Sequence, residues 1–193
     1  MIYRDFEALR QLAGAVRYRL IYADPGWQYR DAASSGKRGA VHKYRVMSYR
    51  EIARLPVPEI ADPAGSLLAM WWVPTQDREA RYVADAWGFN VRTMFGFVWV
   101  KEGRTPGTEP IGMGNWTRAN PEACLLATVG RPKRASAGVR ALVKAPRGAH
   151  SQKPDVVRQR LVQLVGDVPR IELFAREAQP GWDVCGDHIA GEL

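Results

Sequence analysis

The chain has 193 residues, 46% of them hydrophobic and 25% charged, and no long polar tract, which predicts one soluble globular domain over residues 1–193 that can bury a full core. Its 28 Lys and Arg against 20 Asp and Glu give a net charge of +8, which indicates a polyanionic partner without identifying it. Cys124 and Cys185 lie far apart with no Cys or His at metal-ligand spacing, so we expect neither a disulfide framework nor a metal site.

Strands and helices are predicted to alternate along the chain. Short runs of apolar, β-forming residues closed by turns predict the strands, and apolar residues at helical spacing predict the helices. The clearest start signal is Ser48 with Glu51 three residues later, which is a capping-box pattern. In chain order, the sequence predicts strand 18–23, helix 48–55, strand 66–73, helix 75–88, strand 91–100, strand 122–129, helix 154–164 and strand 171–175.

This alternation predicts an α/β fold, a mostly parallel sheet flanked by helices and joined by right-handed crossovers. Ligands of such sheets bind outside the carboxyl ends of the strands, where Asp24, Lys101 and Arg176 are expected. Residues 103–116 contain six Gly and Pro and predict a long irregular loop, and loops of this kind are often functional. No strand is followed by G-x-G-x-x-G, so an ordinary dinucleotide site is not indicated.

The tetrapeptide Asp24, Pro25, Gly26 and Trp27 follows the first strand and is the strongest candidate catalytic segment. An exocyclic aromatic amine is a poor nucleophile because its lone pair is delocalised into the ring, so its methylation needs acceptors that bind both N–H protons. The Asp24 carboxylate and the Pro25 carbonyl can supply them, and Trp27 can stack on an extruded base. A simple strand-ending turn with a core Trp explains the tetrapeptide alone equally well.

Several blocks along the chain carry a family resemblance. The run Ile21 to Trp27 resembles the Asp-Pro-Pro-Trp motif of the N6-adenine methyltransferase family typified by the catalytic subunit of the eukaryotic messenger-RNA adenosine methyltransferase, a family with small prokaryotic and phage members. Further blocks look like those of the family, in the family's order, and the resemblance covers about residues 18 to 188. They are 86–89 (AWGF), 97–101 (FVWVK), 112–127 (GMGNWTRANPEACLLA), 150–155 (HSQKPD), 172–176 (ELFAR) and 181–183 (GWD).

The resemblance implies a permuted, Rossmann-like methyltransferase fold that uses S-adenosylmethionine, with the catalytic loop near the N-terminus and the cofactor strand near the C-terminus. It implies that Lys153 reaches the methionine carboxylate or nearby backbone, and that Phe174 and Arg176 line the ribose and carboxylate side. The full set of residues that the resemblance implies for the cofactor is Asp24, Lys153, Glu172, Phe174, Arg176, Asp187 and His188.

This chain departs from the family pattern at two places. Gly26 stands where the family has a second proline, which keeps a backbone carbonyl but removes the restriction on φ, so the empty loop should be more flexible. Asp187 and His188 stand where the family has the last two residues of its terminal Gly-Asn-Glu or Gly-Asn-Gln segment.

Contacts to the substrate are expected from two loops and a strand end. Trp116 either touches target nucleotides or anchors its loop in the core, and Glu122 either borders the base pocket or is an exposed strand-end carboxylate. Basic segments after the catalytic loop and at 131–147 are interpreted as a phosphate-binding rim in preference to a solvated face. The candidate substrate-binding residues are Lys37, Arg38, Lys43, Asn115, Trp116, Arg118 and Glu122.

The sequence therefore predicts adenine-N6 methylation of nucleic acid, with DNA favoured over RNA and with short or relaxed sequence specificity. The absence of a Pro-Cys dipeptide argues against cytosine-C5 chemistry, whereas cytosine N4 stays open. A catalytically silent, nucleic-acid-binding partner subunit is the alternative from another class. Charges interrupt the first 19 residues and no apolar run is long enough to span a bilayer, so we expect a cytoplasmic protein, monomeric or homodimeric, with no membrane contact.

Overall fold

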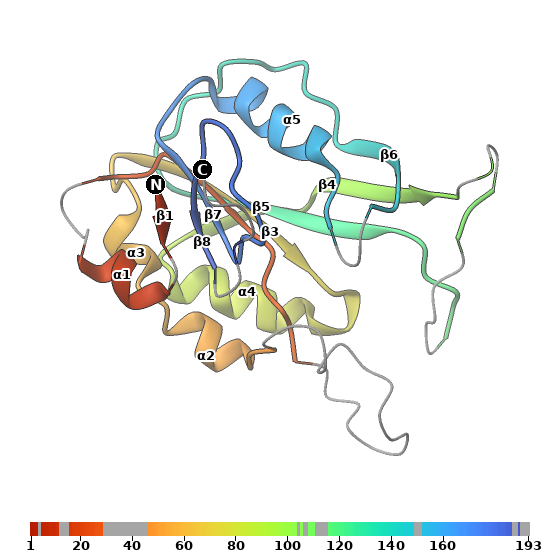
Figure 1. Cartoon of the computed structure of the whole chain (residues 1–193), viewed down its shortest axis with the longest axis horizontal. Coiled ribbons are helices and arrows are strands. Elements are labelled where there is room, and N and C mark those ends of the chain that lie inside the picture. The colour runs from red at the N-terminus through yellow and green to blue at the C-terminus, as the bar shows by residue number, and fades with distance from the viewer. Residues whose placement is uncertain are drawn as a thin grey trace.

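The computed structural model describes residues 1–3, 5–11, 16–28, 46–103, 105, 108–110, 116–148, 152–186 and 189. Within these residues one eight-stranded sheet runs through the molecule, with helices on both faces (Figure 1). The elements are β1 (Ile2–Tyr3), α1 (Phe6–Gln11), β2 (Leu20–Ala23), α2 (Tyr49–Ala53), α3 (Val57–Ile60), β3 (Gly65–Trp72), the 3-10 turn η2 (Pro74–Gln76), α4 (Asp77–Ala86), β4 (Asn90–Glu102), β5 (Glu122–Gly130), β6 (Leu142–Pro146), α5 (Asp155–Val165), β7 (Arg170–Leu173) and β8 (Asp183–Cys185).

The strand order is β1-β8-β7-β2-β3-β5-β4-β6, and every neighbouring pair is parallel except the two pairs that include β5. The predicted mostly parallel α/β sheet is thereby confirmed. Because β5 runs against the others, its first residue lies at the same edge as the carboxyl ends of the remaining seven strands. We call this edge of the sheet the catalytic edge, because the candidate catalytic residue Asp24 follows β2 there.

Side chains of the central strands alternate between two cores. Ile21 and Ala23 of β2 face the helices α1 to α4, whereas Leu20 and Tyr22 face α5. Figure 1 shows α5 on one side of the sheet and α1, α2 and α4 on the other. Both faces of β3 are covered, so all eight of its residues are buried and the strand reads as a continuous apolar run in the sequence.

Most predicted elements are confirmed within a few residues, and the capping box at α2 is present. The Ser48 hydroxyl accepts from the Glu51 backbone N–H at 3.3 Å, and the Glu51 carboxylate accepts from the Ser48 backbone N–H at 2.7 Å. Two predicted helix starts are wrong. The turn η2 precedes α4, so Thr75 does not cap it, and Pro154 occupies the N-cap of α5 rather than its first turn.

Five short elements lie outside the predicted set, namely β1, α1, α3, β6 and β8. No helix among the residues described is both long and apolar enough to span a bilayer. Trp71 and Trp72, near the end of β3, are buried side chains, as their place on an apolar strand indicates.

Candidate active site

Four charged side chains from different elements meet at the catalytic edge. Lys153, just before α5, places its Nζ 2.8 Å from Oδ1 and 2.9 Å from Oδ2 of Asp24. The same Nζ lies 3.3 Å from Oε2 of Glu122, whose Oε1 is 2.6 Å from Nζ of Lys101 at the end of β4. The four groups thus form an alternating series, Lys101, Glu122, Lys153, Asp24, which we call the charge ladder.

The charge ladder is largely removed from water. The Lys153 side chain is 11% exposed and that of Asp24 17%, whereas Glu122 at 34% is the most accessible member. Each lysine also lies over an indole ring, Lys153 over Trp71 and Lys101 over Trp99, both at 5.4 Å from the ring centre. Cations in such positions are held by the ring as well as by the carboxylates.

The geometry of the charge ladder determines the ionisation of Lys153 and Glu122. Burial lowers the pKa of Lys153, but the charges of Asp24 and Glu122 outweigh it and leave that pKa raised. Burial raises the pKa of Glu122, but Lys153 and Lys101 together hold it below its ordinary value. Lys153 and Glu122 are therefore both charged at neutral pH.

The loop after β2 is fixed by backbone hydrogen bonds. The Trp27 N–H donates to the Pro25 carbonyl at 3.0 Å, and the Met47 N–H donates to the Gly26 carbonyl at 2.8 Å. The Gln28 N–H donates to the Met47 carbonyl at 3.1 Å. Residues 26–28 therefore pair with residue 47 as an isolated parallel β-bridge. This bridge supplies rigidity that a second proline would otherwise provide, and Gly26 does not adopt a left-handed φ.

The indole of Trp27 is packed in the core rather than on an open surface. Its side chain is 6% exposed, and its Nε1–H donates to the Trp71 carbonyl at 2.9 Å. The contact ties the loop to β3 and sets the positions of Asp24 and Pro25. Stacking of Trp27 on a base remains a prediction, and the part of the ring that a base could reach in this conformation is small.

Glu172, on β7, is paired with a helix rather than directed to an open site. Its side chain is 7% exposed, and Arg158 of α5 donates to Oε2 at 2.6 Å and to Oε1 at 2.9 Å. The guanidinium also lies over the Tyr22 ring and contacts Asp155. Both carboxylate oxygens are engaged, so this structure favours a role in fixing α5 on the sheet over a direct cofactor contact.

Phe174, directly after β7, has φ +62°, which is unusual for a bulky side chain. Such conformations persist where the surroundings impose them, and they cluster at functional sites. Its ring packs against Phe6 at 5.1 Å between centres. Phe174 follows the strand adjacent to β2, so the strained residue and Asp24 lie at neighbouring strand ends. Arg176, two residues further, is partly buried.

The loop between β4 and β5 is held at its base by Asn120, a residue that sequence reasoning missed. Its side chain accepts from the Lys101 N–H at 2.8 Å and donates to the Lys101 carbonyl at 3.0 Å and to the Pro110 carbonyl at 3.2 Å. The sequence did contain one signal for this role, because an Asn followed by a proline directly before a strand is typical of a turn whose side chain bonds nearby backbone.

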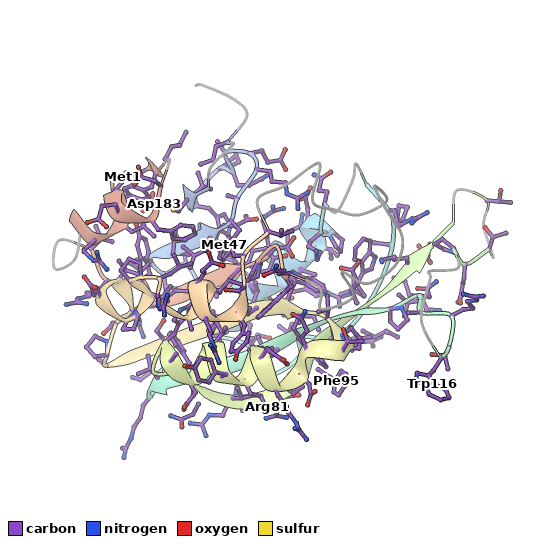
Figure 2. All side chains as sticks on the ribbon, turned by 90° about the horizontal axis from the view of Figure 1, so that it is seen from below. Met1, Met47, Arg81, Phe95, Trp116 and Asp183 are labelled. Atoms are coloured by element: carbon purple, nitrogen blue, oxygen red, sulfur yellow. The ribbon has the colours of Figure 1, made fainter. Side chains whose placement is uncertain are left out.

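Beyond this base, Trp116 is 99% exposed, so the alternative of a core anchor is wrong. Figure 2 shows it at the opposite end of the molecule from Met1 and Asp183. Arg118 is also exposed. The remaining predicted residues lie outside those that the structure describes: Lys37, Arg38, Lys43, Asn115, Asp187 and His188. No cluster of three or more His, Cys, Asp or Glu side chains suited to a metal ion occurs among the described residues.

Known proteins are similar to this chain over most of its length. The MT-A70 family model matches residues 18–188. The chain is 31% identical over 192 residues to the type II methyltransferase M.MunI of a Mycoplasma species, with 90% of this chain and 78% of that protein aligned. It is 24% identical over 185 residues to the N(6)-adenine-specific methyltransferase METTL4 of Homo sapiens and of Mus musculus, and it spans 37% of the length of each.

Proposed function

The chain belongs to the MT-A70 family, and we propose that it transfers a methyl group from S-adenosylmethionine to N6 of adenine in DNA. One observation carries the proposal. The Asp24 carboxylate and the Pro25 carbonyl lie on consecutive residues of a pinned loop at the edge where the strand ends meet. Two adjacent acceptors are what an exocyclic amine requires if both of its N–H groups are to be bound.

Both acceptors keep capacity for the base. A carboxylate offers about four lone-pair positions, and Lys153 uses one on each oxygen of Asp24. The Pro25 carbonyl accepts one bond from the Trp27 N–H and has a second lone pair. Hydrogen bonds from N6 to these oxygens favour a pyramidal nitrogen, whose lone pair is then available for attack.

Lys153 contacts Asp24 directly, and Glu122 holds Lys153 in place. Before transfer, the ammonium group beside Asp24 stabilises its negative charge and fixes the direction of both oxygens. After transfer, the methylated nitrogen must lose one proton, and Asp24 is the adjacent group that accepts it. Glu122 holds Lys153 from the other side, so that the lysine cannot swing away from Asp24.

Several described residues fit the cofactor. S-adenosylmethionine has an amino-acid end of two opposite charges, and Asp24 with Lys153 presents one carboxylate and one ammonium at the catalytic edge. Phe174 offers an apolar ring at the end of the adjacent strand, and Arg176 follows it. When bound, the cofactor supplies an electrophilic methyl group on a sulfonium.

DNA is the polymer that we propose. Similarity over most of both lengths to a type II methyltransferase supports this choice, whereas the METTL4 proteins align over a minor part of theirs. The basic charge of the chain suits either nucleic acid.

The test is transfer of labelled methyl to unmethylated DNA and to RNA, followed by digestion to nucleosides and mass detection. N6-methyladenine in DNA is expected from the wild type, and at least a hundredfold less from Asp24→Asn, because the neutral amide keeps one weaker acceptor oxygen and puts an NH2 donor in place of the other oxygen. Product in RNA alone would refute the choice of polymer. No product on either polymer would refute catalysis by this chain alone, and titration calorimetry with S-adenosylmethionine would then show whether it binds the cofactor as a silent subunit.

A further inference from the structure

Nearly all the net charge of this protein lies in one stretch of sequence. Residues 123–154 contain seven Lys and Arg and no Asp or Glu, and therefore account for seven of the eight net positive charges. One of the seven, Lys153, belongs to the charge ladder. The other six are all exposed, and we call them the basic strip: Arg131, Lys133, Arg134, Arg140, Lys144 and Arg147.

The basic strip has no counter-charges of its own. None of its six side chains forms an ion pair or hydrogen bond with the rest of the described chain. Another exposed cation of the protein, Arg10, does find acids, namely Glu7 and Glu59. Six exposed cations with no carboxylate paired to them add no ion pair to the stability of the fold.

The backbone that carries the strip is nevertheless fixed in place. The N–H groups of residues 135 and 136 donate to the Leu164 carbonyl at 2.8 and 3.4 Å. The Arg160 guanidinium donates to the carbonyls of residues 140 and 142, and the Trp99 indole donates to the carbonyl of residue 145. These contacts tie the segment to α5 and β4 at three points, so the cations are presented on an ordered support.

The strip leads to the catalytic edge. It begins after β5, at the opposite edge of the sheet, where the Arg131 N–H donates to the carbonyl of Ala64 just before β3. It then passes α5 and enters β6, whose Ala145 is paired with Lys101 of the charge ladder (Figure 1). The eight residues of β3 between these two edges span about 26 Å, which is several phosphate spacings of a nucleic-acid backbone.

The composition of the strip specifies what it contacts. Residues 131–147 contain no aromatic residue to stack on a base and no Asn or Gln to read a base edge. Lys and Arg without such partners bind phosphate and position the polymer without reading its sequence. Base contacts must therefore come from other segments, such as the loop that carries Trp116.

We propose that the basic strip binds the sugar-phosphate backbone of the DNA that flanks the target adenine. The proposal rests on the proposed function for its choice of polymer. In this arrangement the backbone follows the side of the molecule along α5 and β6 and delivers the target nucleotide to Asp24. Binding along the strip is independent of sequence, and it depends strongly on salt concentration.

The experiment compares two triple variants that each remove three positive charges. The strip variant is Lys133→Gln, Arg134→Gln, Lys144→Gln, and the control variant is Arg54→Gln, Arg78→Gln, Arg81→Gln, which alters exposed cations on the α2 and α4 side (Figure 2 labels Arg81). Both variants have the same net charge, so a general field effect lowers their affinities equally. All six side chains are exposed, and thermal unfolding should show unchanged folding for both.

Affinity for a fluorescent DNA duplex would be measured by anisotropy over a range of salt concentrations. For the strip variant we expect binding at low salt to weaken at least tenfold and the slope of log K against log salt to flatten by up to about 2.7, since each lost phosphate contact removes about 0.9. The control variant should change the slope by less than a third of that. Equal losses in the two variants would overturn the proposal.

Two further arms test the choice of partner. If the strip variant binds an RNA duplex or anionic lipid vesicles more weakly than the wild type does, with DNA binding unchanged, the assignment to DNA is overturned.

Methyl transfer by the strip variant to a long duplex should show a raised KM and an unchanged kcat, because the strip does not touch the reacting atoms. The anisotropy measurement requires no methyl transfer, so a wild type that binds DNA through the strip but methylates neither polymer would refute the proposed function and leave this inference standing.

Discussion

The charge ladder makes the replacement of Lys153 by Met the most informative perturbation. The substitution keeps the length of the side chain and removes the cation between Asp24 and Glu122, leaving two carboxylates that each lay about 3 Å from it. Breaking a buried pair by removing one partner costs about 3–5 kcal/mol. Because Glu122 is 34% exposed and retains Lys101, we expect the low end of this range, about 3 kcal/mol of unfolding free energy.

The stability that Lys153→Met loses relative to the wild type should depend on pH in a definite direction. In the wild type, the lysines hold the pKa of Glu122 below 4.5, so the stability from this group is complete above pH 4.5 and is lost as pH falls below it. In Lys153→Met, the cation that favoured the charged form of Glu122 is gone, and burial together with the facing Asp24 carboxylate favours the protonated form of Glu122. Protonation of one acid then relieves the repulsion, so the variant gains stability relative to the wild type as pH falls from 8 to 5.

Urea unfolding of both proteins at pH 8 and pH 5 measures this effect. Lys101→Met is the matched control, since Lys101 contacts only Glu122 among the ladder carboxylates and its loss leaves Asp24 paired. We expect the control to lose less than half as much stability as Lys153→Met. A deficit for Lys153→Met that is below about 1 kcal/mol, or that is the same at both pH values, would refute the interpretation of the ladder as a buried, alternating set of charges.

Three further predictions concern single side chains. Gly26→Pro should raise the unfolding free energy by about 0.4–1 kcal/mol and keep methyl transfer. The reason is that the φ of Gly26 is not left-handed and that its N–H makes no backbone hydrogen bond within the described chain. A lower melting temperature of the variant would contradict this prediction. Glu172→Gln should destabilise the protein by about 3 kcal/mol, because Arg158 loses its buried carboxylate partner and keeps only Asp155, whose side chain is 62% exposed. The calorimetric affinity for S-adenosylmethionine should change less than threefold. A tenfold loss of affinity with normal stability would restore Glu172 as a cofactor ligand. Trp116→Ala should leave stability within about 0.5 kcal/mol of the wild type and raise the KM for DNA, and an unchanged KM would remove Trp116 from the substrate-binding surface.

The elements that the sequence predicts well share a physical cause. The fully buried strand β3 reads as an uninterrupted apolar run, and α2 begins at a capping box whose two hydrogen bonds are local. In contrast, β6 alternates exposed and buried residues inside a basic segment, and β1 has two residues, so neither carries a local signal strong enough to identify it. Their positions are set by pairing with distant strands.

In the candidate site, too, the sequence predicts some residues but not the contacts between them. Asp24 is predictable because a strand-ending turn is a local feature, and the family resemblance pointed to Lys153. The pairing of Lys101 with Glu122, and of Glu122 with Lys153, depends on which strands are neighbours, and that information is not local. The two tryptophans with open alternatives behave in opposite ways, since Trp27 is buried and Trp116 is exposed, and single-sequence reasoning has no means of separating them.

The reversed strand β5 connects the catalytic site to the basic strip. If β5 were parallel to its neighbours, Glu122 would lie at the far edge and Lys153 would have Asp24 as its only acidic partner in the ladder. Because β5 is antiparallel, its first residue lies at the catalytic edge and its last residue at the far edge, so the chain must return along α5 to reach β6. That return path carries four of the six cations of the basic strip, and the other two lie in β6 (Lys144) and directly after it (Arg147). One strand reversal therefore supplies both the carboxylate that holds Lys153 against Asp24 and the path along which we propose that the DNA backbone lies.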